Sequence, residues 1–310
     1  MGSVVVLILK IALPAIGILA IWKRDDRLLK LFGVSIVCVL GLGVVGLALS
    51  VAARHTLKYD LWLYSAETAL GSPAFAIGRL LRPTRLYPVL VAVYEALPIA
   101  LLLVYAAHLL ARGGVPGRVL AAYALNFGVG YCVYLLLPAC GPGYAFPGFP
   151  AASPALTLDT LKLVAPPNCM PSLHTSTAIL AYWFCRRWRF ARAVALINLV
   201  LTVFATLATG EHYAVDLVAA VPFAVFVYAA SERRYHAAAA WLALVLMWCG
   251  ALRFGPAYIS AEPRAFLIVC LVTIVGAWLY AAHMHSGWRA RRAFERLARQ
   301  VFERRQNAAA

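Results

Sequence analysis

The chain has 310 residues, of which 64% are hydrophobic and only 13% are charged, and this balance excludes a water-soluble globular domain. The formal net charge of +16 comes from 28 lysines and arginines set against 12 acidic residues. The basic residues sit in short loops and in a C-terminal tail, which argues against a nucleic-acid partner and for a chain that crosses a membrane several times.

Apolar runs long enough to span a membrane recur along the chain. A bilayer core roughly 30 Å thick needs about 20 mostly apolar residues in a helix, because every backbone polar group must be paired within its own segment. About nine runs satisfy this, at residues 4–21, 31–51, 86–111, 119–137, 173–188, 193–209, 214–230, 237–252 and 265–282. The predicted fold class is all-α, a polytopic membrane helix bundle of about nine transmembrane helices.

The basic residues also predict an orientation. If the N-terminus lies outside and the nine runs alternate, most lysines and arginines fall in inside loops or in the tail at 286–310, as the positive-inside rule requires. We therefore expect an outside N-terminus and a cytoplasmic C-terminus. The tail either lies as an amphipathic helix on anionic lipid or is a solvated flank.

Two stretches interrupt the hydropathy pattern. Residues 54–85 alternate aromatic and aliphatic side chains with charges, which predicts one or two short helices lying in the outer interface. Residues 138–171 are rich in Pro, Gly and small residues, and long loops of this kind are often functional. Cys140 and Cys169 bracket this loop, and they either form a disulfide or remain free thiols.

Two histidines and an aspartate lie at the outer ends of predicted spans. His212 and Asp216 are four residues apart at the start of a helix, so their side chains share one helical face. Asp216 can then accept the proton of one imidazole nitrogen and leave the lone pair of the other directed outward, which makes His212 a better nucleophile. His174 begins the span after the long loop, on the same outer face.

The residues around His174 predict an anion site. Ser172 is placed to cap the helix that contains His174, and the first turn of that helix offers unpaired N–H groups to phosphate oxygens. Two histidines at such a site can divide phosphoryl transfer, one as nucleophile and the other as acid and then base. The alternatives are structural roles or zinc binding, for which the sequence shows no fourth ligand.

The motifs P-S-L-H at 171–174 and H-Y-x-x-D at 212–216 resemble the type 2 phosphatidic acid phosphatase superfamily of membrane lipid phosphatases and phosphotransferases. With the preceding stretch at 134–142, they look most like its inositol phosphorylceramide synthase (aureobasidin-resistance) branch. The resemblance covers roughly residues 86–230. It implies His212 as the nucleophile of a phosphohistidine intermediate, Asp216 as its orienting partner, His174 as acid and then base, and neither metal nor cofactor.

The phosphatase branch usually carries more positive charge than this chain. Phe75 stands where that branch has a lysine before Arg82, and Ala205 and Thr206 stand where it has a Ser-Arg pair. A monoester phosphate carries nearly two negative charges at neutral pH and a diester carries one, so a site with fewer cations favours a diester donor.

Four residues are candidates for binding the phosphate. Arg79 and Arg82 either supply charge to the phosphate or hold an interfacial helix to lipid head groups. Tyr213 either approaches the phosphate or anchors the interface, and Ser172 lies at the helix start. Other polar groups inside predicted spans also have open roles. Glu95 is expected to be a buried, hydrogen-bonded carboxyl, and Asn126, Tyr131 and Tyr134 either line the cavity or pack between helices.

These observations predict one membrane domain over residues 1–310, with a six-helix catalytic core at about 86–230. The expected activity is transfer of a phosphoryl head group from a membrane phospholipid donor to a lipid alcohol acceptor, at an active site on the extracytoplasmic face. The alternatives are a lipid phosphate phosphatase that hydrolyses phosphatidate or prenyl (pyro)phosphate, and a lipid transporter or scramblase. The sequence gives no oligomeric state.

Overall fold

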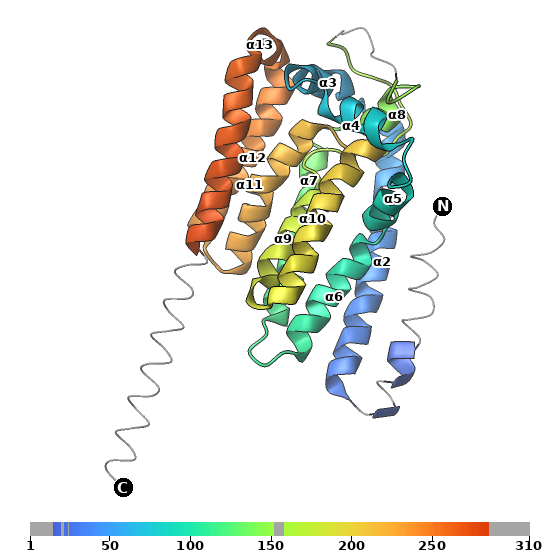
Figure 1. Cartoon of the computed structure of the whole chain (residues 1–310), viewed down its shortest axis with the longest axis vertical. Coiled ribbons are helices and arrows are strands. Elements are labelled where there is room, and N and C mark those ends of the chain that lie inside the picture. The colour runs from blue at the N-terminus through green and yellow to red at the C-terminus, as the bar shows by residue number, and fades with distance from the viewer. Residues whose placement is uncertain (1–14, 20–21, 24, 152–157, 285–310) are drawn as a thin grey trace, which may run out of the picture.

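The computed structural model describes residues 15–19, 22–23, 25–151 and 158–284, and nearly all of them are helical (Figure 1). The helices are α2 (Asp26–His55), α3 (Asp60–Ala69), α4 (Pro73–Leu81), α5 (Tyr87–Glu95), α6 (Leu97–Leu110), α7 (Pro116–Tyr134), α8 (Pro142–Ala145), α9 (Leu173–Phe184), the 3-10 turn η1 (Cys185–Arg187), α10 (Arg189–Thr209), α11 (Ala214–Ser231), α12 (Tyr235–Phe254), α13 (Pro256–Ala261) and a C-terminal helix, Pro263–Met284. The predicted all-α class is confirmed.

The polytopic bundle is also confirmed, although the number of spans is not fixed. Five of the described helices are long and apolar enough to cross a membrane, namely α2, α10, α11, α12 and the C-terminal helix, and the bent pair α5–α6 makes a sixth if it is one span. With 19 and 12 residues, α7 and α9 fall short of the same criteria of length and apolarity. Most of the first predicted run, at 4–21, lies outside the described residues, as does the tail at 286–310. The count of nine stays a prediction.

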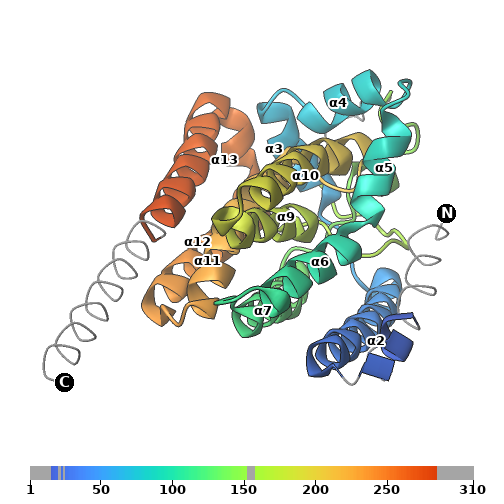
Figure 2. The same ribbon diagram turned by 60° about the horizontal axis from the view of Figure 1, so that its bottom comes forward.

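Helix α11 forms the centre of the bundle. Its most apolar stretch is 83% buried, whereas that of α2 is 6% buried. A helix that is apolar on every face is surrounded either by lipid or by other helices, and α7, α9 and α12 all pack against α11. Figures 1 and 2 show α2 at one side of the bundle and the C-terminal helix at the other. The peripheral helices therefore present their apolar side chains outward.

The run predicted as a single span at 86–111 is broken in the structure. Helices α5 and α6 meet at Ala96 with a bend of 55°. Pro98 explains the break, because it has no N–H to donate to the carbonyl of Tyr94 and its ring crowds that carbonyl. Glu95, expected to be buried in mid-span, is instead the half-buried last residue of α5.

The stretch at 54–85 forms two short helices, as predicted, but α3 is not a helix with one face resting on lipid. Seven of its first eight residues are buried, all except Trp62: Asp60, Leu61, Leu63, Tyr64, Ser65, Ala66 and Glu67. The helix is covered because α11, α12 and α13 pack against it. It belongs to the body of the protein.

The two ends of the bundle differ in charge and in structure. One end carries α3, α4, α8 and the long loop, and the opposite end carries the turns that join α6 to α7, α9 to α10 and α11 to α12 (Figure 1). Those turns contain Arg112, Arg187, Arg189, Arg233 and Arg234. These turns are rich in arginine, but Arg79 and Arg82 lie at the other end, on and beside α4. The orientation stays a prediction.

Candidate active site

His174 and His212 lie together at the end of the bundle where α9 and α11 begin. Their ring centroids are 6.3 Å apart and their planes are inclined by 59°. His212 is 2% exposed, whereas His174 is half-buried. The sequence predicted that these two side chains share one end of the bundle, and the structure places them close enough to contact one tetrahedral group from two sides.

The hydrogen bond of His212 differs from the predicted one. Its Nδ1 is 2.7 Å from the carbonyl oxygen of Cys169 and 3.6 Å from Oδ2 of Asp216. A carbonyl oxygen only accepts hydrogen bonds, so Nδ1 carries the proton and Nε2 keeps its lone pair. We expected the carboxylate of Asp216 to accept this proton. The nearer acceptor is instead a main-chain carbonyl of the long loop, and Asp216 is an adjacent negative charge.

Asp216 organises the start of α11. Its Oδ2 accepts a hydrogen bond from the backbone N–H of Tyr213 and another from the thiol of Cys169, each at 2.7 Å. Its Oδ1 is buried, and within the described residues it has no hydrogen-bond partner. A buried carboxylate oxygen without a partner is costly, and a positive charge nearby offsets that cost. The unpaired oxygen therefore belongs to a buried carboxyl beside the ring of His212.

Cys169 joins His212 and Asp216 in a group of three possible metal ligands. Donor atoms of Cys169, His212 and Asp216 lie within 4.8 Å of one another. Burial raises the pKa of the Cys169 thiol well above its usual range, and this thiol donates a hydrogen bond to Asp216. The sequence left open whether Cys140 and Cys169 form a disulfide. In the structure both are buried free thiols.

Ser172 and Tyr213 make contacts within the protein. The side chain of Ser172 accepts a hydrogen bond from the backbone N–H of Thr175 at 3.3 Å, so the predicted cap of α9 is confirmed. The hydroxyl of Tyr213 donates to Oδ1 of Asp60 at 3.0 Å, and its side chain is fully buried. Of the two roles considered for Tyr213, this contact favours the anchor.

Arg82 clamps three backbone carbonyls. Its Nε and Nη2 donate to the carbonyls of Ala208 and Thr209 at 2.9 and 2.7 Å, and its Nη1 donates to the carbonyl of Phe149 at 2.9 Å. Carbonyls at the end of a helix have no partner within the helix, so Arg82 satisfies those of α10 and joins them to the long loop. Arg79 donates to the Pro150 carbonyl at 3.2 Å. Both contacts hold segments that lead to His212.

Phe75 fills its position with apolar packing. Its ring contacts those of Tyr64, Phe146 and Phe149, with centroids 5.3, 5.9 and 4.9 Å away. Phe75 therefore lies in the middle of an aromatic cluster. The cluster fixes α8 and the loop after it on α3 and α4.

Glycines allow this loop to approach the turn before His212. Gly141 has φ +90°, and a Cβ there would lie 2.3 Å from the carbonyl oxygen of Glu211. The backbone N–H of Gly143 donates to the carbonyl of Gly210 at 2.8 Å. The glycines of the loop thus allow its backbone to lie in close contact with the backbone at Gly210 and Glu211.

Sequence reasoning missed two buried acidic residues on α3. Asp60 accepts hydrogen bonds from the backbone N–H groups of Cys140 and Gly141 as well as from Tyr213. Glu67 accepts from Ala74 at 2.5 Å and from Ala214 at 2.7 Å, so it caps both α4 and α11. Burial raises the pKa of Asp60 to about 6 and that of Glu67 to about 7. The sequence feature that could have indicated them is the presence of two acidic residues in an otherwise apolar segment.

Tyr94 and Glu211 were also missed. The ring of Tyr94 stacks on that of His174, with centroids 3.7 Å apart and planes inclined by 15°. The hydroxyls of Tyr94 and Tyr144 hydrogen-bond to Glu211, the residue before His212. Tyr94 therefore links the two histidine segments. No local pattern shows this, because the contact depends on the bend between α5 and α6.

Comparison with known proteins gives one result. A family model described as the PAP2 superfamily matches residues 61–230, which run from α3 to α11 and include both histidines and Asp216. The match begins before the region at 86–230 that the motifs suggested, so it takes in α3 and α4. The comparisons with curated proteins and with solved structures found no match.

We expect Glu67→Gln to lower the melting temperature of the protein. Glutamine presents an NH₂ group to one of the two backbone N–H donors, so one helix cap is lost, at a cost of about 1–2 kcal/mol. Thermal unfolding of the purified protein in detergent measures the effect. The matched control is Glu232→Gln, which breaks a partly exposed ion pair with Arg118 and should change little. Equal melting temperatures for the two variants would contradict the double cap.

Proposed function

The chain belongs to the PAP2 superfamily, the type 2 phosphatidic acid phosphatases and their relatives, and from this premise we propose that it is a lipid phosphotransferase. Membership makes the protein an integral membrane enzyme of the lipid phosphatase and phosphotransferase type. Our proposal is that it moves the phosphoryl head group of a phospholipid to the hydroxyl of a second lipid. The observation that carries it is the pair of imidazoles with centroids 6.3 Å apart, one of them with Nε2 free.

In the first half of the proposed reaction, Nε2 of His212 attacks the phosphorus atom of a phosphodiester. The bond between phosphorus and the oxygen of the leaving lipid alcohol breaks, and His174 gives its proton to that oxygen. The negative charge of the bound diester favours the protonated form of His174. The product is a phosphohistidine whose ring cation is stabilised by the Cys169 carbonyl at Nδ1 and by Asp216 3.6 Å away.

In the second half, the hydroxyl of the acceptor lipid gives its proton to His174 while its oxygen attacks phosphorus. The N–P bond breaks, the electron pair returns to Nε2 of His212, and His174 is protonated for the next cycle. In the first turn of α9, Ser172 accepts from the N–H of Thr175 and Tyr134 bonds to the backbone of Leu173, so the N–H of His174 is the group left for a phosphate oxygen.

The contacts of Arg79, Arg82 and Phe75 support a diester donor. Arg79 and Arg82 donate to backbone carbonyls, and Phe75 is part of an aromatic cluster. A diester brings one negative charge where a monoester brings nearly two, so the site suits the diester better. The basic turns at the opposite end of the bundle support an active site that faces the extracytoplasmic side (Figure 1).

His212→Ala should abolish both turnover and the phosphoenzyme. Without the nucleophile we expect a loss of about 1,000-fold or more. Incubation with a donor labelled at phosphorus, followed by peptide mapping, measures an acid-labile and base-stable phosphate on residue 212. His236→Ala is the matched control because His236 is exposed at the far end of the bundle, and it should behave as wild type. Normal turnover by His212→Ala would remove the nucleophile assignment.

Asp216→Asn should cost about tenfold in kcat, far less than the loss of the nucleophile. The Cys169 carbonyl still fixes the proton on Nδ1, so the variant loses only the charge beside the ring. Where a carboxylate alone sets the tautomer of a catalytic histidine, the same change costs about 10⁴-fold. Steady-state kinetics of folded protein separates these cases, and a 10⁴-fold loss would mean that Asp216 is the acceptor.

A mixed lipid pool tests transfer against hydrolysis. Purified protein is incubated with several phospholipids, ceramide and diacylglycerol, and the products are identified by mass spectrometry. We expect a phosphorus-containing head group to appear on ceramide or diacylglycerol, and His212→Ala to produce none. Release of inorganic phosphate from phosphatidate or prenyl pyrophosphate, without head-group transfer, would select the phosphatase alternative.

A further inference from the structure

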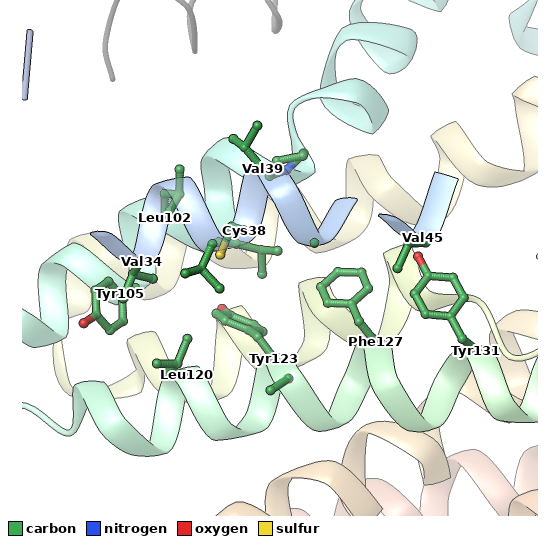
Figure 3. A pocket seen from close by; sticks show the side chains of 15 residues that line it. Val34, Cys38, Val39, Val45, Leu102, Tyr105, Leu120, Tyr123, Phe127 and Tyr131 are labelled. Carbon is green, nitrogen blue, oxygen red and sulfur yellow. The ribbon is translucent and has the colours of Figure 1, made fainter. Parts of the chain in front are cut away.

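An apolar cavity opens between α2, α6 and α7, away from the histidines (Figure 3). Its volume is about 220 Å³, and residues that line it include Val34, Cys38 and Gly41 on α2, Leu101 on α6 and Phe127 on α7. Val45 and Tyr131 also line a second hollow, which therefore continues the first toward Ala52 and Tyr134. We call the two together the α2 groove.

The α2 groove has the length of a membrane leaflet or more. Its lining residues on α2 run from Val34 to His55, and at 1.5 Å per residue this is about 32 Å of helix. The hydrocarbon core of a bilayer is roughly 30 Å thick. The groove thus follows a membrane-spanning helix over most of the depth at which lipid chains lie.

One end of the groove is lined by Tyr134, which contacts the segment that carries His174. Phe127, Tyr131 and Tyr134 follow one face of α7, with centroids 6.5 Å apart for the first pair and 5.6 Å for the second. Figure 3 shows Phe127 and Tyr131 pointing toward α2. The hydroxyl of Tyr134 hydrogen-bonds to the backbone of Leu173, which precedes His174. The aromatic row therefore leads from the middle of the bundle to the phosphate site.

We propose that the α2 groove holds one hydrocarbon chain of the lipid whose phosphorus group reacts at His212. This rests on the proposed function and adds the part of the substrate that the groove would select. The groove also lies partly outside the family match, because α2 precedes residue 61.

The chemistry of the groove fits a hydrocarbon chain better than a polypeptide. An extended peptide would leave its N–H and C=O groups unpaired against apolar side chains at membrane depth. The two hollows hold about 220 and 360 Å³ spread along the groove, and a helix about 10 Å across with its side chains is too thick for so narrow a space. Their lining is almost wholly apolar, so the groove suits one chain of a lipid whose head group lies elsewhere.

A matched pair of glycines on α2 tests the proposal. Gly41 lines the groove and Gly43 does not, and a Cβ at either position meets no atom within 4 Å. Gly41→Phe should fill the groove, and Gly43→Phe makes the same change on the other side of the helix. With phosphatidylinositol as the probe donor, we expect Gly41→Phe to lower kcat/KM about tenfold for the dioleoyl form and to leave the dihexanoyl form unchanged. Gly43→Phe should change neither.

A second measurement does not depend on turnover. Phosphatidylinositol with a diazirine at the end of one oleoyl chain is photolysed with the protein in detergent, and the labelled peptides are identified. We expect label on α2 and α7 in the wild type and in His212→Ala, and little in Gly41→Phe.

The outcomes separate the two proposals. Label confined to other helices, or equal loss of kcat/KM for both chain lengths in Gly41→Phe, would overturn the groove while His212 kept its role. Label on α2 and α7 in a protein that forms no phosphohistidine would support the groove and end the proposed function.

Discussion

The hydrogen bond from Nδ1 of His212 to the carbonyl of Cys169 is the contact on which the rest of the site depends. It fixes the tautomer and so decides which nitrogen faces the phosphate. A main-chain acceptor is reliable only if its loop is held, and three contacts hold this one. Asp60 binds the backbone of Cys140 and Gly141, the N–H of Cys169 donates to Ala139, and Arg82 binds the carbonyl of Phe149. Contacts that look structural therefore set the chemistry of the nucleophile.

The buried acids of α3 follow from the same requirement. Two carboxyls in a segment shielded from water are costly, as their raised pKa values show, and they are tolerated when backbone N–H groups surround them. Glu67 joins the first residues of α4 and α11, and Asp60 joins the long loop to Tyr213. Helix ends need acceptors for their free N–H groups, so each acid satisfies groups that would otherwise be unpaired. The result is a rigid frame around His212 built from segments far apart in the sequence.

Local patterns predicted the elements of this site, and long-range contacts completed it. The i, i+4 spacing of His212 and Asp216 and the Ser172 cap are local, so the sequence alone placed these side chains at helix starts. The nearer acceptor for Nδ1 was not predicted, because the Cys169 carbonyl comes from 43 residues away. The stacking of Tyr94 on His174 needs the break that Pro98 causes, and the burial of α3 needs α12 and α13. Hydropathy reports the length of an apolar run, and it does not report how other helices cover it.

A site with few free cations must position its substrate by other means. Moving a lipid chain from the bilayer into the α2 groove exchanges one apolar environment for another, so the hydrophobic effect adds little affinity. The groove acts through shape instead. A chain confined along α7 loses its translational and rotational freedom when it binds, and the phosphorus atom is then held near Nε2 of His212 for reaction. Because the residues matched by the family begin at 61, the helix that shapes this groove is additional to the part that holds the histidines. On this account, the shared fold supplies the phosphoryl chemistry and α2 selects which lipid chain reaches it.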